Sequence, residues 1–218
     1  AVPARAGERV LDLGCGAGAA ALCLAARVPG LVLAGLELQP GYAALARENA
    51  AAAGLPFEVI EGDAARPPAA LRAMSFDHVV SNPPWYAEGA ASPSPDPARD
   101  AAHREALALG DWIAAGLRRL KPGGRLTLIQ RAERLGAILG ALEGRAGAVR
   151  VLPLAAREGR AAKRVIVQAR KGAKGPLALL APLVLHAGPA HIADRDDFTA
   201  AAAAVLRDAA PLDLDARA

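Results

Sequence analysis

A glycine-rich segment at residues 11–18, with the sequence Leu-Asp-Leu-Gly-Cys-Gly-Ala-Gly, constrains the fold of this chain most. It overlaps a segment at residues 8–13 that we interpret as a short buried strand, and it precedes an Ala- and Leu-rich run at residues 19–27 that is typical of a helix. Glycines allow the tight turn between such elements, and they let backbone N–H groups approach a ligand beside a helix N-terminus. The segment therefore predicts the first strand, loop and helix of an α/β fold, with a ligand site at the loop.

The alternation of apolar strands and helices continues along the chain. Turn residues such as Val-Pro-Gly at 28–30 and Lys-Pro-Gly-Gly at 121–124 end the helices. This alternation predicts a doubly wound, mostly parallel sheet. The last two strands are joined by a basic connection that is too short for a well-formed helix, so we expect an antiparallel pair at the sheet edge. The expected strands are 8–13, 31–37, 57–60, 76–81, 125–130, 149–154 and 164–170, and the expected helices are 19–27, 42–53, 102–120, 131–143 and 197–207.

The composition describes a globular chain that needs no disulfides or structural metal. Of its 218 residues, 53% are hydrophobic and 22% are charged, which excludes a disordered chain. Cys15 and Cys23 have no His at ligand spacing, so we expect reduced thiols in a cytoplasmic protein. Residues 1–10 lack the basic and apolar regions of a signal peptide, and no stretch reaches the roughly 18 apolar residues that cross a bilayer, so we expect neither secretion nor a membrane span. Because the chain lacks an initial Met and enters a strand almost at once, we expect an N-terminal segment of the natural protein to be missing from it.

Two acidic residues narrow the ligand of the glycine loop. Glu37 ends the second strand, where its carboxylate is placed to accept hydrogen bonds from both ribose hydroxyls of an adenosine. Asp63 follows the third strand and is placed for the exocyclic amine of an adenine, although an aspartate there also fits a simple turn. The spacing Gly14-x-Gly16-x-x-Ala19 also matches the permissive dinucleotide fingerprint. NAD, S-adenosylmethionine and a glycine turn without a ligand all stay open at this step.

The motif Asn82-Pro83-Pro84-Trp85, after the fourth strand, is the most informative in the chain. Its prolines stiffen the backbone and lack N–H donors, so the loop is held with its carbonyl groups pointing outward. The Asn82 side-chain oxygen and the Pro83 carbonyl are two acceptors for the hydrogens of a planar NH2 group, and Trp85 supplies a face for stacking. The alternative is a proline-stiffened turn with an exposed aromatic residue. Hydride transfer has no use for this arrangement, so the motif favours transfer to an amine nitrogen.

In this order, the motifs resemble those of the class I S-adenosylmethionine-dependent methyltransferases that alkylate NH2 nitrogens. The resemblance covers about residues 8–170. It implies a Rossmann-like methyltransferase fold with a seven-stranded sheet, in a single domain over residues 1–218 that includes a C-terminal extension at 176–218. It also implies S-adenosylmethionine as the cofactor, S-adenosylhomocysteine as the product, and no metal. The implied cofactor-binding residues are Asp12, Gly14, Gly16 and Gly18 around the methionine part, Glu37 at the ribose and Asp63 at the adenine.

In this superfamily the Asn-Pro-Pro-aromatic motif marks two substrate classes: exocyclic amines of nucleobases, chiefly adenine, and the side-chain amide of a glutamine in release factors or ribosomal proteins. The rest of the sequence resembles the bacterial tRNA adenine-N6 methyltransferases, through residues 103–105, 121–124, 151–154 and 162–167 and more loosely through the tail. This group more often has Tyr where the present chain has Trp85. The resemblance implies a tRNA partner methylated at adenine N6. A glutamine substrate and a non-catalytic cofactor- or RNA-binding role stay as alternatives.

A basic segment at residues 157–174 supplies a candidate surface for nucleic acid. The chain has 26 Lys and Arg against 22 Asp and Glu, and a net charge of +4, which permits a polyanionic partner without demanding one. Because Glu158 is the only acid in this segment, it forms either a solvated basic face or a surface that contacts phosphates. The residues that we expect to contact RNA phosphates are Arg157, Arg160, Lys163 and Arg164.

Overall fold

The structure is a computed structural model that describes residues 1–84, 86–87, 104–105, 107–190 and 197–218. Its strands are β1 (Arg9–Leu13), β2 (Val32–Glu37), β3 (Phe57–Glu61), β4 (Phe76–Ser81), β5 (Tyr86–Ala87), β6 (Arg104–Glu105), β7 (Leu120–Arg131), β8 (Ala146–Ala155), β9 (Arg164–Lys171), β10 (Ala178–Leu179) and β11 (Leu183–Val184). Its helices are α1 (Ala19–Arg27), α2 (Pro40–Ala52), α3 (Ala69–Arg72), α5 (Leu109–Arg119), α6 (Leu135–Leu142) and α7 (Ala200–Leu206), with a 3-10 turn, η1 (Ala132–Arg134), before α6.

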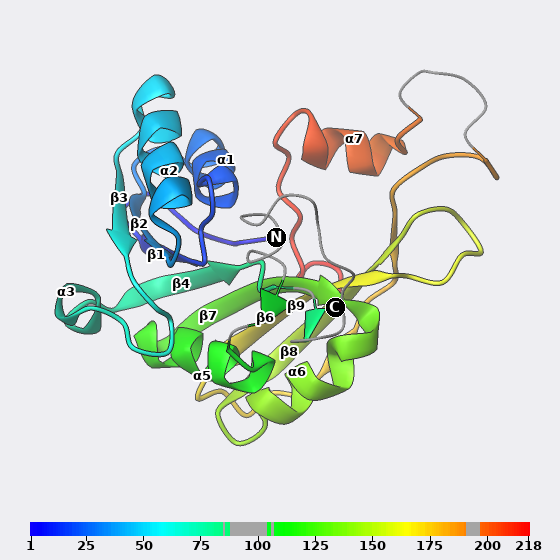
Figure 1. Cartoon of the computed structure of the whole chain (residues 1–218). Coiled ribbons are helices and arrows are strands. Elements are labelled where there is room, and N and C mark those ends of the chain that lie inside the picture. Colours follow the sequence, from blue (N-terminus) through cyan, green and yellow to red (C-terminus); the bar gives the residue numbers. More distant parts are fainter. Residues whose placement is uncertain (85, 88–103, 106, 191–196) are drawn as a thin grey trace.

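One mixed sheet of nine strands runs through the described chain, in the order β10-β8-β9-β7-β4-β1-β2-β3 with β11 also on β8 (Figure 1). The strands β7, β4, β1, β2 and β3 are parallel to one another, whereas β9 is antiparallel to both β7 and β8. The predicted doubly wound, mostly parallel fold and the predicted antiparallel pair are therefore confirmed. The structure contains two strands in this sheet besides the seven predicted ones, because β10 and β11 both pair with β8 and extend the sheet beyond it.

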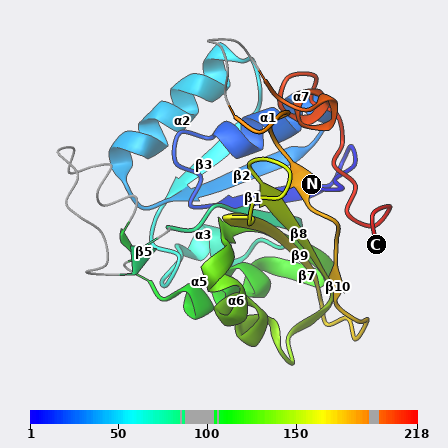
Figure 2. The same ribbon diagram turned by 90° about the vertical axis from the view of Figure 1, so that its right-hand side faces the viewer.

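Helices cover both faces of the sheet (Figure 2). Val10 and Val80 pack in an apolar cluster with α1 on one face, while their strand neighbours Leu11 and Val79 pack with α5 and α6 on the other. This separation follows from the alternation of side chains along a strand. Both faces of β1 and β4 are therefore buried, and only the ends of these central strands are accessible to a ligand.

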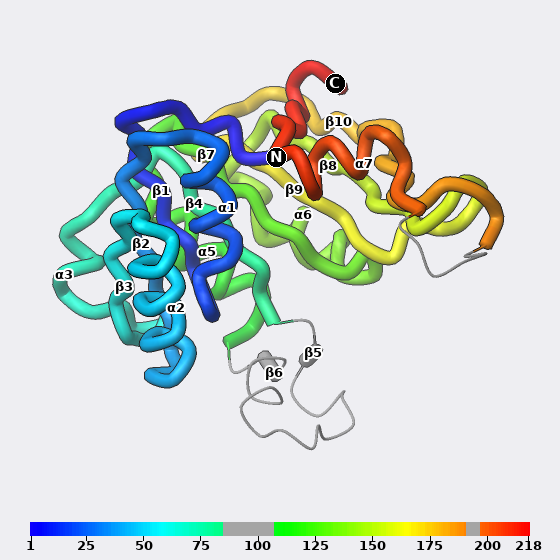
Figure 3. The backbone as a smooth tube through the Cα atoms, turned by 90° about the horizontal axis from the view of Figure 1, so that it is seen from above, coloured from blue at the N-terminus to red at the C-terminus, as the bar shows by residue number. Residues whose placement is uncertain are grey.

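The C-terminal extension packs on β8 and β9, on the face that also carries α1 (Figure 3). Its apolar residues Leu180, Leu183, Leu212 and Leu214 form a cluster with Leu152. The predicted helix at 197–207 begins at Ala200 instead, because the preceding threonine caps it with a hydroxyl that accepts a 3.2 Å hydrogen bond from the backbone N–H of Ala202.

The predicted helix at 102–120 also differs from the structure. Arg104–Glu105 form the short strand β6, and the helix itself, α5, begins only at Leu109 and ends at Arg119, directly before β7. Residues 88–103 and 106 lie outside the described chain. The predicted helix at 131–143 begins with η1 and continues as α6, which ends at Leu142. Among the described residues, no helix is long and apolar enough to cross a membrane.

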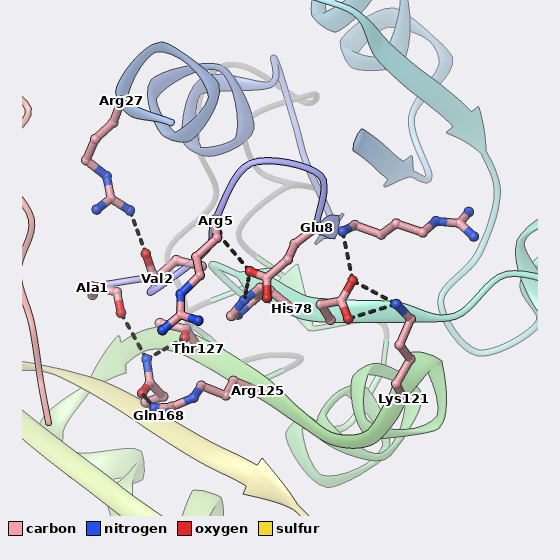
Figure 4. A network of polar contacts seen from close by, with 12 residues as sticks. Ala1, Val2, Arg5, Glu8, Arg27, His78, Lys121, Arg125, Thr127 and Gln168 are labelled. Carbon is pink, nitrogen blue, oxygen red and sulfur yellow. Dashed lines mark hydrogen bonds and ion pairs between the residues drawn. The ribbon is translucent and has the colours of Figure 1, made fainter. Parts of the chain in front are cut away.

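Polar contacts join β1, β4 and β7 at the end of the sheet opposite to the glycine loop (Figure 4). His78 Nε2 lies 3.0 Å from Glu8 Oε2, and burial lowers the pKa of His78. Asp77 accepts hydrogen bonds from Lys121 Nζ at 2.8 Å and from the backbone N–H of Arg9 at 2.9 Å. Because these contacts lie at the other end of the sheet from the glycine loop, we interpret them as structural.

Candidate functional site

A cavity of about 490 Å³ opens at the carboxyl ends of β1, β2, β3 and β4. This volume lies within the range of roughly 300–1,000 Å³ that is usual for small-molecule sites. The carboxyl ends of parallel strands are also the edge at which doubly wound sheets bind ligands. The sequence-predicted site residues that line this cavity are Asp12, Gly14, Gly16, Glu37, Asp63, Asn82, Pro83 and Pro84.

The glycine loop turns sharply between β1 and α1. Gly14 has a φ of 74° and Gly16 a φ of 52°, a region that side chains rarely adopt. The backbone N–H groups of Gly14 and Cys15 donate hydrogen bonds of 2.8 and 3.0 Å to the Leu36 carbonyl of β2. Gly18, which we predicted to bind the cofactor, stands at the N-cap of α1 and outside the cavity wall. The loop is thus a tight turn fixed on β2, and Gly18 serves the turn.

Glu37 is held rigidly at the end of β2, with 8% of the residue exposed. Its Oε2 accepts a 2.8 Å hydrogen bond from the backbone N–H of Gly16, and its Oε1 accepts one of 2.9 Å from that of Gln39. A carboxylate has about four acceptor positions in total. After these two bonds, Glu37 therefore keeps acceptor capacity for the two hydroxyls of a ribose.

Asp12 is buried at the floor of the glycine loop, with 2% of the residue exposed. Its Oδ2 accepts a 3.2 Å hydrogen bond from the backbone N–H of Ala21, in the first turn of α1. Burial raises the pKa of Asp12 to about 7, and the nearby charge of Glu37 acts in the same direction. Burial also raises the pKa of the Cys15 thiol, to about 12. Cys15 is therefore a neutral wall residue rather than a nucleophile.

The geometry of Asp63 is compatible with both roles considered from the sequence, a turn residue and a ligand of the adenine amine. Its Oδ1 accepts a 2.8 Å hydrogen bond from the backbone N–H of Ala65, which closes a turn after β3. The residue is also exposed and lines the cavity. Because a carboxylate has a second oxygen, the turn is compatible with a hydrogen bond to a ligand.

The motif Asn82-Pro83-Pro84-Trp85 follows β4, and we call it the amine-binding loop after the role predicted from the sequence. Its described residues 82–84 line the cavity. Asn82 is exposed, Pro83 is buried and Pro84 is partly buried, whereas Trp85 lies outside the described residues. Asn82 and Pro83 thus face the same space as the glycine loop.

Sequence reasoning missed two residues that connect these loops. The Ser81 hydroxyl donates to the Leu13 carbonyl at 2.7 Å, and Trp112 Nε1 donates to the Ser81 hydroxyl at 2.9 Å. Trp112 also lines the cavity and packs on Gly14, where a Cβ atom would lie 2.8 Å from the indole ring. The available signals were the position of Ser81 directly before Asn82 and the rarity of tryptophan, of which the chain has two.

The basic segment is divided between opposite ends of the sheet. Arg160, Lys163 and Arg164 are exposed, and Arg164 pairs with Arg131 at the carboxyl end of β7, on the side of the cavity. Arg170 pairs with Arg125 at the other end of the same strand. Only the first part of the segment therefore lies at the same edge of the sheet as the amine-binding loop.

Arg157, the fourth predicted RNA contact, is engaged within the protein. Its guanidinium forms a 2.5 Å ion pair with Asp197 and donates to the carbonyl groups of Ala187 and Gly188. Asp197 in turn accepts from His186 Nδ1 at 2.6 Å. These contacts fasten the C-terminal extension to the connection between β8 and β9.

Comparisons with known proteins agree with this geometry. The model of the methyltransferase small domain family matches residues 1–152. A tRNA1(Val) (adenine(37)-N6)-methyltransferase from Porphyromonas gingivalis is 35% identical over 133 residues, which are 59% of this chain and 51% of that protein. A release factor glutamine methyltransferase from Deinococcus radiodurans is 43% identical over 79 residues, which are 35% of this chain and 26% of that protein.

Structural similarity covers almost the whole chain. The crystal structure of a predicted O-methyltransferase, protein Atu636 from Agrobacterium tumefaciens, superposes with a TM-score of 0.75 at 28% identity, over 94% of this chain and 90% of that one. The present chain spans about half the length of the tRNA methyltransferase that it matches. Because the family model matches well over half of the chain, and the cavity lies where the fold binds ligands, the chain belongs to the methyltransferase small domain family of S-adenosylmethionine-dependent methyltransferases.

Proposed function

We propose that this chain is an S-adenosylmethionine-dependent methyltransferase that acts on an exocyclic amino nitrogen, and that this nitrogen is adenine N6 in a tRNA. One observation carries the proposal: Asn82 and Pro83 line the same cavity as the glycine loop, Glu37 and Asp63. A site suited to a nucleoside and a pair of acceptors suited to an NH2 group thus share one space.

The residues of the cavity fit S-adenosylmethionine. Gly14 and Gly16 bring the backbone close to the space, and Glu37 has acceptor capacity for the ribose. Asp63 is placed for the adenine, and Asp12 offers a carboxyl group toward the cationic methionine part. When bound, S-adenosylmethionine supplies an electrophilic methyl group on a sulfonium cation.

The protein's own contribution is to position the amine. The Asn82 side-chain oxygen and the Pro83 carbonyl accept the two N–H groups of the amine, which directs its lone pair toward the methyl donor. Such orientation can supply roughly 7–11 kcal/mol of a barrier in favourable cases. The proton of the product cation can leave to solvent, so the mechanism uses no strong general base.

The tRNA substrate is supported by the name of the Porphyromonas gingivalis relative and by the basic residues on the cavity side of the sheet. We propose that Arg160, Lys163 and Arg164 contact RNA phosphates while the target adenine leaves its stack to reach the amine-binding loop. Arg157 belongs to the same connection, and we assign it the role of holding this connection through Asp197.

A protein glutamine is the second candidate substrate. The Deinococcus radiodurans relative, 43% identical over 79 residues, is named for glutamine methylation of a release factor. The same two acceptors would hold the NH2 group of a glutamine side-chain amide. This candidate does not require the basic surface at residues 160–164.

The two substrates are distinguished by offering labelled S-adenosylmethionine with tRNA, ribosomal RNA, DNA and a release-factor preparation in parallel. We expect label in tRNA, recovered as N6-methyladenosine after nucleoside analysis. Label in protein alone would establish the glutamine candidate. Binding of the cofactor without transfer to any of the four would favour a non-catalytic role.

The amine-binding loop is tested separately with Asn82→Ala. Removing one of two acceptors that act in the transition state should lower the transfer rate about 100-fold, by analogy with the loss of one oxyanion-hole donor. Cofactor affinity should stay within a few-fold of wild type, because Glu37 and the glycine loop are unchanged. An Asn82→Ala variant that retained the full transfer rate would rule out the positioning mechanism.

A further inference from the structure

Gln130 is a buried polar side chain directed at the amine-binding loop. It lies near the carboxyl end of β7, and 1% of the residue is exposed. Its Nε2 donates a 3.1 Å hydrogen bond to the carbonyl oxygen of Pro84 and a longer one, of 3.4 Å, to that of Pro83. Its Oε1 accepts a 2.8 Å hydrogen bond from the backbone N–H of Arg131. The amide is thus oriented by its own strand, and both of its donor contacts reach the loop.

The chemistry of the loop explains why such a donor is needed. Pro83 and Pro84 have no N–H group, so neither residue can be anchored through its own nitrogen. Contacts to their carbonyl oxygens are the backbone hydrogen bonds that remain. A carbonyl oxygen has two lone pairs, so the Pro83 carbonyl can accept from Gln130 and still accept from an amine. A buried amide without these partners would be strongly unfavourable, and the contacts are therefore maintained.

We infer that Gln130 is a positioning residue that sets the direction of the Pro83 carbonyl, and through it the position of the amine nitrogen relative to the methyl donor. The inference rests on the proposed function, because it requires an amine at Asn82 and Pro83. Gln130 is outside the cavity wall and reaches the substrate only through the loop. Its loss should therefore slow methyl transfer without weakening cofactor binding.

Gln168 provides a matched control. It lies on β9, next to β7 in the sheet, and 2% of the residue is exposed. Its Nε2 donates to the Thr127 hydroxyl at 3.1 Å, and its Oε1 accepts from Arg125 at 2.8 Å. Replacing either glutamine by methionine keeps the length of the side chain and removes a buried amide. Only the change at Gln130 alters contacts to the amine-binding loop.

The experiment compares Gln130→Met with Gln168→Met in the full chain. Both should lower the melting temperature by similar amounts. Gln130→Met should lower kcat for transfer to the amine substrate 10- to 100-fold, as expected for a small displacement of a reacting group. The KM for S-adenosylmethionine, and the Kd for S-adenosylhomocysteine measured by calorimetry, should stay within about twofold of wild type. Gln168→Met should keep the wild-type kcat.

A second pair of variants, Gln130→Glu and Gln168→Glu, tests the inference independently if a methionine variant does not fold. Glutamate keeps the shape of glutamine, but an ionised carboxylate accepts hydrogen bonds and cannot donate them. In an assay at pH 9, above the raised pKa expected of a buried carboxyl group, Gln130→Glu should therefore repel the Pro83 and Pro84 carbonyls and lower kcat at least as much as Gln130→Met. The Kd of each variant for S-adenosylhomocysteine is measured by calorimetry beside its kcat, and a folded Gln130 variant that binds it many-fold more weakly than wild type counts against the inference.

The outcomes separate this inference from the proposed function. A wild-type chain that methylates an amine, together with Gln130 variants as active as the Gln168 variants, would overturn the inference alone. An effect of the Gln130 variants on cofactor KM with an unchanged kcat would also overturn it. A wild-type chain that binds the cofactor and methylates no amine would overturn the proposed function and the inference with it.

Discussion

The hydroxyl of Ser81 donates a 2.7 Å hydrogen bond to the carbonyl oxygen of Leu13, and so joins the last residues of two neighbouring strands. Leu13 directly precedes the glycine loop, and Ser81 directly precedes Asn82. One buried hydrogen bond therefore spans the two loops that line the cavity. Trp112 holds the same hydroxyl from α5, at 2.9 Å. The distance between the two loops thus depends on the Ser81 side chain, which does not itself line the cavity.

Ser81→Ala should reduce methyl transfer more than cofactor binding. The variant loses the bond to Leu13 and leaves the Trp112 indole N–H without its acceptor, which should lower the free energy of unfolding by about 1–3 kcal/mol. A small shift of the loops should lower the single-turnover rate roughly tenfold or more. Thr127→Val, which removes another buried hydroxyl from the sheet, is the control for stability. Equal transfer rates in the two variants would contradict a role of Ser81 in spacing the loops.

Gly14→Ala should destabilise the glycine loop for two separate reasons. The residue has a φ of 74°, and an added Cβ atom would lie 2.8 Å from the Trp112 ring. Gly7→Ala is a control for backbone strain alone, because Gly7 has a φ of 84° and no heavy atom within 4 Å of its Cβ position. Strain of this kind costs about 1–3 kcal/mol. We expect urea unfolding to show a larger decrease in the free energy of unfolding for Gly14→Ala than for Gly7→Ala. Calorimetry should show weaker cofactor binding only for Gly14→Ala. A loss no larger than that of Gly7→Ala would show that the ring simply moves aside.

Topology alone explains why site residues predicted from the sequence line one cavity. Gly14, Glu37 and Asn82 lie far apart along the chain, but each follows or ends a parallel strand, and such strands end at one edge of the sheet. The type of each residue then indicated its chemistry. The antiparallel pair was equally predictable, because the connection between its strands leaves no room for a helix.

Contacts that depend on strand register could not be predicted. Gln130 reaches Pro84, 46 residues away, only because β7 lies beside β4 in one particular register. The partner of Arg157 is Asp197, 40 residues further along in the tail, and no local pattern connects them. The two-residue strand at Ala178–Leu179 is too short to show any periodicity. These features are set by tertiary packing rather than by local sequence.

Cofactor affinity should depend on pH through Asp12. Burial raises the pKa of this carboxyl group to about 7, so the group is mostly neutral at pH 6 and mostly ionised at pH 8 in the ligand-free protein. A cationic ligand favours the ionised form, so binding should strengthen as the pH rises. For a single group with this pKa, the affinity should increase by up to about tenfold between pH 6 and pH 8.

Asp12→Asn isolates this effect, because asparagine keeps an acceptor for the Ala21 N–H but does not titrate. Titration of S-adenosylmethionine into both proteins at pH 6, 7 and 8 gives the ratio of their affinities, from which the ionisation of the ligand itself cancels. As the pH rises from 6 to 8, we expect the affinity of the wild-type protein to increase relative to that of Asp12→Asn. A ratio that is independent of pH would mean that the charge of Asp12 does not act on the ligand.

Arg157 should matter for stability more than for RNA binding. Arg157→Ala removes the ion pair with Asp197 and the bonds to two tail carbonyls, at side chains that are only 14% and 20% exposed. Hydrogen bonds to charged groups contribute about 1.5–3 kcal/mol, so the extension should detach more readily. Limited proteolysis should cut the variant faster between residues 187 and 197 than wild type. The exposed neighbour Arg160, changed to Ala, should leave the cleavage rate unchanged.

Because β9 separates the basic segment into two parts at opposite ends of the sheet, we can predict which basic residues affect the binding of an RNA. Arg160 and Lys163 lie on the cavity side, where the Lys163 carbonyl accepts a 3.0 Å hydrogen bond from the backbone N–H after β7. Arg170 and Lys174 lie toward the opposite end of the sheet. Each phosphate contact contributes about one to the slope of log affinity against log salt. Removing Arg160 and Lys163 together should therefore lower the slope for tRNA binding by about two, whereas removing Arg170 and Lys174 should leave it unchanged, although both double variants lose the same net charge. Equal losses of slope would mean that tRNA responds to the net charge of the protein and not to the edge of the sheet that carries the amine-binding loop.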